Sequence, residues 1–306
     1  MKKRFKRIIG KLNAKEQSSG QIELDIERRM EPDRNLNEGG RSFYFFDFDD
    51  NVLFLSTPIF IFHKKTKKEK KISSSEFALV RQEIGVSGVY KDYELNFCPA
   101  DGSYRNFRDK EYTKIERKLH SVIGKKEGFV EDIKAALVKA EVFWKGPSWG
   151  CFYHAVFNER PISVITARGH HPETVKEGIS LLVKHGHLPK EPNYLEIYPV
   201  NYINTCQQLG HTLNDDVADV KKSAIKAAVK KATEVYGLNY PHRFGMSDDD
   251  PKNLRLIMEA MGELKNQYPH MSFFVISTYN GGFLKQEVFP TKKSGFENFD
   301  KQLDLF

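Results

Sequence analysis

The stretch that most constrains the fold covers residues 42–55, with the sequence SFYFFDFDDNVLFL. Four consecutive aromatic residues at 43–46 predict a buried strand, because a strand covered on both faces is apolar without alternation. Three carboxylates, Asp47, Asp49 and Asp50, follow within four positions. Like charges at the end of an apolar strand repel one another, so the pattern indicates a bound cation or a carboxylate that takes part in chemistry.

Strands and helices alternate along the rest of the chain. Apolar runs predict strands at residues 161–166, 194–200, 244–246 and 273–278, and helical spacing predicts helices at residues 129–143, 147–157, 172–185, 214–236 and 251–268. This order predicts an α/β fold, with an open parallel Rossmann-like sheet and helices on both faces. The carboxyl ends of parallel strands meet at one edge, so we expect the polar residues that follow each strand to gather there.

Several polar residues lie at such positions. Thr166 ends the strand at 161–166, and Lys221 lies near the start of the helix at 214–236, where Lys222 is the alternative. The sequence SDDDPKN begins at Ser247, and its first two carboxylates, Asp248 and Asp249, are candidate metal ligands. Asp250 is the competitor for the second ligand, or it caps the helix that follows. The terminal Glu of an EF-hand is missing, which argues against a Ca²⁺ loop.

The order strand, Asp47, one residue, Asp49 and turn resembles the first motif of the haloacid dehalogenase superfamily of phosphohydrolases. The resemblance covers about residues 42–278, and Asn51 stands where that family usually has Thr or Val. It implies that Asp47 attacks phosphorus and becomes an aspartyl phosphate. It also implies that Asp49 protonates the leaving oxygen and then activates water.

The resemblance implies roles for the later residues as well. Thr166 and Lys221 would stabilise charge on the phosphoryl group, and Asp47, Asp248, Asp249 and the backbone carbonyl of Asp49 would hold Mg²⁺. The expected protein is therefore a magnesium-dependent, metal-binding hydrolase, specifically a phosphatase of this superfamily.

The domain boundaries follow from composition and from the same resemblance. Residues 1–41 are expected to be a basic, flexible leader, and residues 42–58 and 150–290 the core. Residues 59–149 are expected to be a flap and cap insertion, part of which forms a crossover helix of the core. The flap is a predicted β-hairpin with KKTKKEKK at its turn, followed by a helix at 76–84 that Ser74 or Ser75 caps. Residues 291–306 are a tail.

Basic charge is concentrated in two places, although the chain as a whole carries +7. Residues 1–15 hold seven Lys or Arg and no acid, and six lysines lie between Lys64 and Lys71. Such patches suit a polyanion or serve only solubility. The hairpin and the sequence TARG resemble RNA-repair-like members related to polynucleotide phosphatases. The expected substrate is a small phosphorylated metabolite or a phosphorylated nucleic-acid end. The alternative is a non-catalytic protein that binds a phospho-ligand or nucleic acid.

Cysteine usage and hydropathy bear on the cellular compartment. Cys98, Cys151 and Cys206 are widely spaced and odd in number, which favours reduced thiols in a cytoplasm over a disulfide framework. Cys151 and His154 are helical neighbours, but two ligands are too few for a structural metal site. No apolar run reaches the roughly 18 residues of a membrane span, so no membrane association is expected.

Overall fold

The central element of the fold is a mostly parallel β-sheet. The computed structural model describes residues 15–16, 22–23, 29–110, 126–279 and 282–290. Within these, six strands lie in the order β11-β10-β9-β3-β7-β8. They are β3 Ser42–Phe46, β7 Ile162–Thr166, β8 Tyr194–Pro199, β9 Arg243–Asp248, β10 Ser272–Ser277 and β11 Leu284–Val288. Only β11 is antiparallel to its neighbour. The predicted α/β class, with an open and mostly parallel sheet, is therefore confirmed.

The strand order reverses beside β3. The chain runs from β3 to β7 and β8 on one side, and then returns to form β9 and β10 on the other side. Where strand order reverses in this way, the crossover connections leave in opposite directions and a crevice opens at the carboxyl ends of the strands. The residues that follow β3 therefore lie at the mouth of that crevice.

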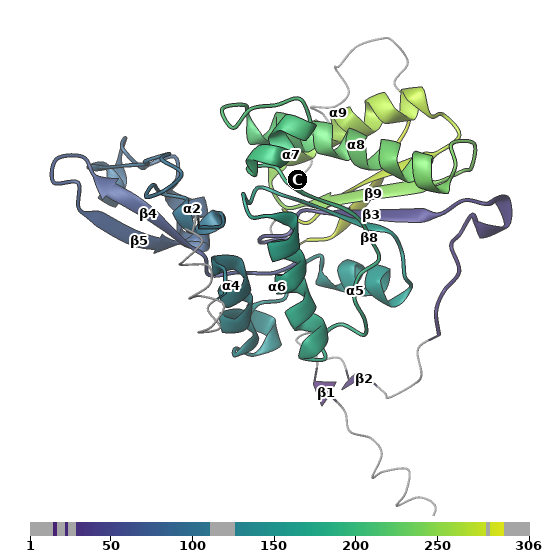
Figure 1. Cartoon of the computed structure of the whole chain (residues 1–306), viewed down its shortest axis with the longest axis horizontal. Helices are drawn as coiled ribbons and strands as arrows, with labels where there is room; N and C mark the ends of the chain where they lie inside the picture. The colour runs from purple at the N-terminus through teal and green to yellow at the C-terminus, as the bar shows by residue number, and fades with distance from the viewer. Residues whose placement is uncertain (1–14, 17–21, 24–28, 111–125, 280–281, 291–306) are drawn as a thin grey trace, which may run out of the picture.

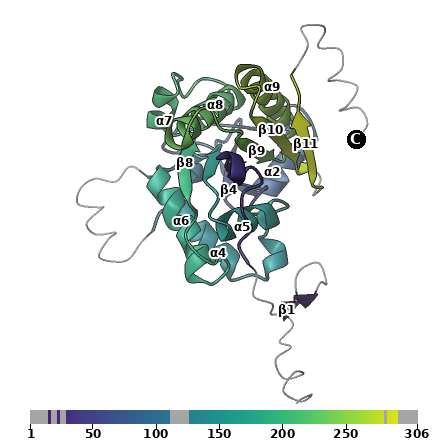
Figure 2. The ribbon, with the colours of Figure 1, turned by 90° about the vertical axis from the view of Figure 1, so that its right-hand side faces the viewer.

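Helices cover both faces of the sheet (Figure 1, Figure 2). One face carries α4 Gly128–Leu137, α5 Trp149–Phe157 and α6 Pro172–Lys184, and the other carries α7 Ile203–Gln208, α8 Val217–Tyr236 and α9 Pro251–Gln267. Phe43 and Phe45 belong to the hydrophobic core under α8 and α9, whereas Phe46 belongs to the core on the opposite face. Successive side chains of a strand point to opposite faces, so the aromatic run contributes to both cores.

The long helix α8 ends where the sequence predicts and begins at Val217, three residues later than predicted. Asp216 caps it, since its side chain accepts a hydrogen bond from the backbone N–H of Ala218, and Gly237 follows the last turn with a φ of +97°. One face, with Ala224, Ile225 and Ala228 among others, is fully buried. The apolar spacing of about 3.6 residues therefore sets which face of α8 packs on the sheet.

A smaller antiparallel sheet lies to the left of the main sheet in Figure 1. It contains β4 Pro58–His63, β5 Glu69–Ser73 and β6 Tyr93–Glu94. The same part of the chain forms α2 Ser74–Val80 and the 3₁₀ turns Gly88–Tyr90 and Arg105–Phe107. The pairing of β4 with β5 gives the predicted hairpin, with the lysine-rich turn at its end. The helix is capped by Ser73 rather than by Ser74 or Ser75, because the Ser73 hydroxyl accepts from the N–H of Glu76. It ends at Val80, earlier than predicted.

Two elements of the core differ from prediction. Helix α4 ends at Leu137 instead of continuing to 143, because Val138 and Ala140 are exposed and a further turn would bury nothing. A short 3₁₀ turn, Glu141–Phe143, then brings Trp144 into the core. The edge strand β11 is not predicted, since its sequence LKQEV shows no clear alternation, and its pairing with β10 makes it a strand.

The segment before β3 is anchored over the part that the structure describes. Residues 29–41, which include the 3₁₀ turn Leu36–Glu38, belong to the predicted flexible leader. Asp33 is nevertheless buried and forms an ion pair with Arg160 at 2.6 Å, and its side chain also accepts from the N–H of Ser42 at 2.9 Å. These contacts correct the prediction of a flexible leader for this stretch.

Other terminal regions are described only in part. The short strands β1 Lys15–Glu16 and β2 Ile22–Glu23 pair with each other in antiparallel fashion. Most of the basic leader, and the predicted tail at 291–306, lie outside the described residues. Among the helices that the structure does describe, none combines the length and the apolar character needed to cross a membrane.

Candidate functional site

The carboxylates and the lysine singled out in the sequence come together at the carboxyl ends of β3 and β9. Asp47 directly follows β3, and Asp248 is the last residue of β9, the strand next to it. The backbone N–H of Asp47 donates to the carbonyl oxygen of Ser247 at 3.0 Å, which locks the two strand ends side by side. Parallel pairing therefore brings together two carboxylates about two hundred residues apart in the chain.

Lys221 lies between these two carboxylates. Its ammonium group is 3.0 Å from Asp47 Oδ1 and 3.0 Å from Asp248 Oδ2, and the residue is only 2% exposed. Burial alone would lower the pKa of Lys221, but the carboxylates of Asp248 and Asp47 raise it above its ordinary value. The alternative, Lys222, points to α9 and pairs with Glu259 and Glu263. Lys221 is thus the lysine that reaches the cluster.

Asp248 is held in position by residues that follow it in the chain, at the start of α9. The side-chain amide of Asn253 donates to both of its carboxylate oxygens, at 3.1 and 3.2 Å, and the N–H of Asp250 donates to Oδ1 at 3.0 Å. The Asp250 side chain instead caps α9 by accepting from the N–H of Lys252 at 2.8 Å. The structure therefore assigns the cap to Asp250 and leaves Asp249 beside Asp248 in the cluster.

Asp47, Asp248 and Asp249 form a group that fits a divalent cation. One carboxylate oxygen from each lies within 4.8 Å of the other two. Burial, followed by the charges of Asp248 and Asp50, raises the pKa of Asp249 to about 7. A single lysine does not balance three crowded carboxylates, and an all-oxygen donor set is what hard cations such as Mg²⁺ prefer. The residues present therefore suit a magnesium ion.

Asn51 is a structural residue of this site that sequence reasoning did not single out for a role. It is fully buried, and its amide nitrogen donates to the backbone oxygens of Asp47 and Ser247 at 3.0 and 3.1 Å. Its amide oxygen accepts from the Thr278 hydroxyl at 2.7 Å. Asn51 thus ties together the carboxyl ends of β3, β9 and β10. The sequence signal for this role was that Asn51 stands where the family that the chain resembles usually has Thr or Val.

Asp49 points to different partners from those of Asp47. Its carboxylate accepts from the guanidinium of Arg168 through Nε and Nη2, at 2.9 and 2.6 Å, and from the Thr166 hydroxyl at 3.3 Å. Thr166 therefore lies next to Asp49, at the end of β7. Arg168 was not among the predicted site residues. The sequence showed only that Arg168 is a charged residue two positions after the strand predicted at 161–166, and not that it contacts Asp49.

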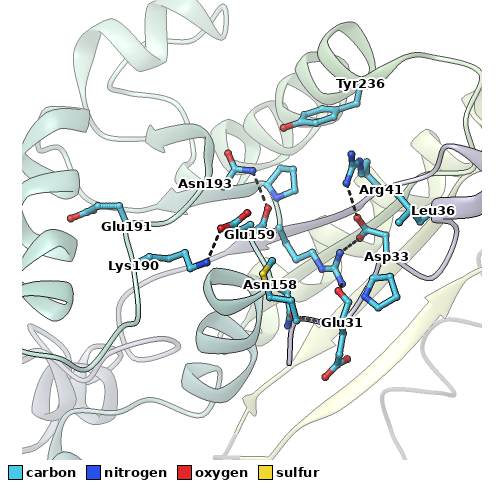
Figure 3. A pocket seen from close by; sticks show the side chains of 14 residues that line it. Glu31, Asp33, Leu36, Arg41, Asn158, Glu159, Lys190, Glu191, Asn193 and Tyr236 are labelled. Carbon is cyan, nitrogen blue, oxygen red and sulfur yellow. Dashed lines mark hydrogen bonds and ion pairs between the residues drawn. The ribbon is translucent and has the colours of Figure 1, made fainter. Parts of the chain in front are cut away.

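A hollow of about 680 Å³ lies at the opposite edge of the sheet (Figure 3). Its lining includes Arg41, Arg160 and Asn193, which precede β3, β7 and β8, and also Asp33 from the anchored N-terminal segment. The hollow thus lies at the amino ends of the strands, away from the carboxylate cluster. In open α/β sheets ligands bind at the carboxyl ends, so the cluster, and not this hollow, is the candidate functional site.

Comparisons with known proteins returned nothing for this chain. A scan against protein-family models, a search of curated proteins and a search of solved structures each gave no match. The functional argument therefore depends on the geometry of the site itself.

Proposed function

We propose that this chain is a Mg²⁺-dependent phosphatase that hydrolyses a phosphomonoester through an aspartyl phosphate, as its resemblance to haloacid dehalogenase phosphohydrolases implies. The observation that carries the proposal is the position of Lys221, buried between Asp47 and Asp248 at 3.0 Å from each. A buried cation beside a carboxylate at a strand end favours the binding of a phosphate dianion next to a carboxylate nucleophile.

The proposed reaction has two steps. In the first, a carboxylate oxygen of Asp47 forms a bond to phosphorus, and the bond to the leaving oxygen breaks as that oxygen takes the proton of the Asp49 carboxyl group. In the second, the Asp49 carboxylate takes a proton from water, whose oxygen attacks phosphorus. The bond from phosphorus to Asp47 then breaks and phosphate leaves. Thr166 and Lys221 stabilise the charge on the phosphoryl oxygens.

Mg²⁺ would be held by Asp47, Asp248 and Asp249, with the backbone carbonyl of Asp49. When bound, the ion supplies the positive charge that offsets repulsion between the Asp47 carboxylate and a phosphate dianion. The all-oxygen cluster and the raised pKa of Asp249 support this assignment.

The finer architecture belongs to the same proposal. We assign the hairpin at 58–73 as a flap and the segment 59–149 as a cap insertion that also supplies core helix. Two contacts between this segment and the site loops support the assignment. The Ser74 hydroxyl donates to the carbonyl oxygen of Leu55 at 3.0 Å, and Arg81 lies 3.6 Å from Asp250. Three free cysteines support a reducing, cytoplasmic compartment.

The proposed substrate is a small phosphorylated metabolite or a phosphorylated nucleic-acid end. For the second, the exposed lysines of the hairpin turn supply charge complementarity, and the basic leader would add to it. Some hairpin lysines also have local partners: Lys64 donates to the carbonyl oxygens of Gly85 and Lys91, and Lys67 pairs with Glu94.

The test is turnover of p-nitrophenyl phosphate by the purified chain, with Mg²⁺ and with EDTA. We expect Asp47→Asn to lower turnover by at least about a thousandfold, because it removes the nucleophile at nearly constant volume. Lys221→Gln should also lose most activity. Lys222→Gln is the matched control, a neighbouring lysine directed at α9, and should retain it.

Wild-type activity in Asp47→Asn, or activity that survives exhaustive chelation, would rule out this mechanism. A chain that gives no turnover but binds a phosphorylated ligand in a Mg²⁺-dependent way would instead be the non-catalytic binding protein.

A further inference from the structure

Arg168 is a buried cation that contacts Asp49, one of the predicted catalytic residues. It is 1% exposed, and its Nε and Nη2 atoms meet the two oxygens of Asp49 at 2.9 and 2.6 Å. A guanidinium taken out of water is costly unless its charge and its donors are satisfied. Asp49 supplies the charge, in the planar two-point geometry that arginine makes and lysine cannot.

Further contacts fix the direction of this guanidinium. Nη2 also donates to the Thr57 hydroxyl at 2.7 Å, and Thr57 in turn donates to Asp132. The guanidinium carbon lies 5.0 Å from the ring centre of Phe107 and 4.7 Å from that of Phe129. In contact with two rings and hydrogen-bonded at its edge, the side chain has little rotational freedom.

These contacts link four parts of the chain around Asp49. Thr57 directly precedes the first strand of the hairpin, Asp132 is on α4, and Arg168 follows β7. Asp132 lies 3.9 Å from Nη1 of Arg168, so the guanidinium is flanked by a second carboxylate. Asp49 itself is about one quarter exposed, which makes it the most open of the four side chains. The arrangement therefore holds Asp49 on its buried side.

We propose that Arg168, oriented by Thr57, is a positioning residue that holds the Asp49 side chain toward the leaving-group oxygen. As a cation Arg168 favours the carboxylate form of Asp49, so its contribution is the orientation of that side chain and not the supply of its proton. The inference rests on the proposed function and adds a residue to it. Proton transfer requires donor and acceptor within about 2.6 to 3.2 Å, so a carboxyl group free to rotate would lose much of its effect. Arg168 does not touch the reacting atoms and acts through Asp49.

The experiment compares substrates that differ only in how much they need a proton on the leaving group. The phenolate leaving group of phenyl phosphate needs protonation, whereas p-nitrophenolate leaves well without it. We expect Arg168→Lys to lower kcat/KM for phenyl phosphate at least about tenfold more than for p-nitrophenyl phosphate, within the range of general acid catalysis. Asp49→Asn should show a larger difference between the two substrates, in the same direction.

A double variant gives an independent readout. If Arg168 acts only through Asp49, adding Arg168→Lys to Asp49→Asn should not widen the ratio between the two substrates, because interacting residues are not additive. Thr57→Val, which removes one hydroxyl at constant shape, should give a smaller split in the same direction. It also serves as the second variant if Arg168→Lys folds poorly.

The matched control is Arg160→Lys. Arg160 is also buried and paired with an aspartate, at 2.6 Å from Asp33, but at the other end of β7. We expect it to lower stability without changing the ratio between the substrates. A crystal structure of Arg168→Lys should show the Asp49 carboxylate displaced.

Equal losses on both substrates, or an unmoved Asp49 in the variant, would overturn the positioning role while leaving the phosphatase proposal intact. Absence of turnover in the wild type, or full activity in Asp47→Asn, would overturn the proposed function, and this inference with it.

Discussion

Asp47 and Asp49 lie two residues apart, yet their carboxylates face different surroundings. Asp47 contacts Lys221 in the carboxylate cluster, and Asp49 contacts Arg168 and Thr166 at the end of β7. The repulsion expected from their sequence spacing is reduced, because the two carboxylates contact different buried cations, Lys221 and Arg168. At the scale of single residues, the site is therefore defined by pairing and not by acidic charge alone.

His170 gives a residue-scale prediction about pH. It is fully buried, and burial, with the charge of Arg168, lowers its pKa well below the usual range. The unfolded chain binds a proton at His170 near pH 6.5, whereas the folded chain binds it only at a much lower pH. The contribution of the neutral His170 to the free energy of unfolding is therefore fully present above pH 6.5 and is lost as the pH falls. Relative to neutral pH, we expect the proton uptake of His170 on unfolding to lower the free energy of unfolding by about 1.4 kcal/mol at pH 5.5.

Urea unfolding of the wild type and of His170→Asn at pH 7.5 and 5.5 measures this effect. The wild type should lose more stability between these pH values than the variant does. His185→Asn, at an exposed position, is the control and should behave as the wild type. An identical pH difference in the wild type and in His170→Asn would contradict the prediction.

The hairpin is the element on which the nucleic-acid alternative for the proposed substrate depends. Lys64 and Lys67 make contacts within the small sheet, and Lys70 lies 4.6 Å from the ring centre of Tyr90. These three lysines therefore contribute to the packing of the small sheet that contains the hairpin. Lys65, Lys68 and Lys71 are exposed and can be altered with less effect on the fold.

We expect the triple change of Lys65, Lys68 and Lys71 to Gln to weaken binding of a phosphorylated oligonucleotide. It should also flatten the salt dependence of binding, by up to about 0.9 in log–log slope for each phosphate of duplex DNA that the variant no longer neutralises. Turnover of p-nitrophenyl phosphate should be unchanged, because the carboxylate cluster is untouched. The measurement is the ratio of kcat/KM for the two substrates, at low and high salt.

A matched triple change of exposed lysines elsewhere, at Lys139, Lys184 and Lys230, controls for net charge. It should leave the ratio near the wild-type value. If the hairpin variant also leaves the ratio unchanged, the small phosphorylated metabolite becomes the better substrate.

At the scale of the whole molecule, the described N-terminal segment lies against the amino ends of β3 and β7. Asp33 contacts Arg160, which precedes β7 by two residues, and also the start of β3 (Figure 3). The segment is therefore part of the α/β unit rather than an appendage to it. Its ion pair is buried, and such a pair matters most when one partner is removed.

We expect Asp33→Ala to lower the free energy of unfolding by about 3 to 5 kcal/mol, because Arg160 is left buried without its counter-charge. Denaturant unfolding measures this decrease. Glu173→Ala, which breaks an exposed pair with Lys176, should cost less than about 1 kcal/mol. The double variant Asp33→Ala, Arg160→Met should recover part of the stability. A cost for Asp33→Ala as small as that of the control would mean that the segment is not anchored by this pair.

Sequence periodicity and capping determined much of the fold. The apolar strands, the amphipathic helix α8 and its cap at Asp216 depend on near neighbours, so their local patterns predict them. The order of strands and helices also determined that Asp47, Thr166 and Asp248 would lie at one edge, because parallel strands share their carboxyl ends. The strand β11 and the end of α4 were not predicted, because packing rather than propensity sets them.

Tertiary structure alone decided which side chains meet at that edge. Lys221 and Lys222 differ by one position, and only the rotation of α8 against the sheet turns Lys221 to Asp47 and Lys222 to α9. The pairs of Arg168 with Asp49 and of Arg160 with Asp33 join residues more than one hundred positions apart. Such contacts depend on how strands pair and helices pack across the whole chain, and no local pattern in the sequence encodes them.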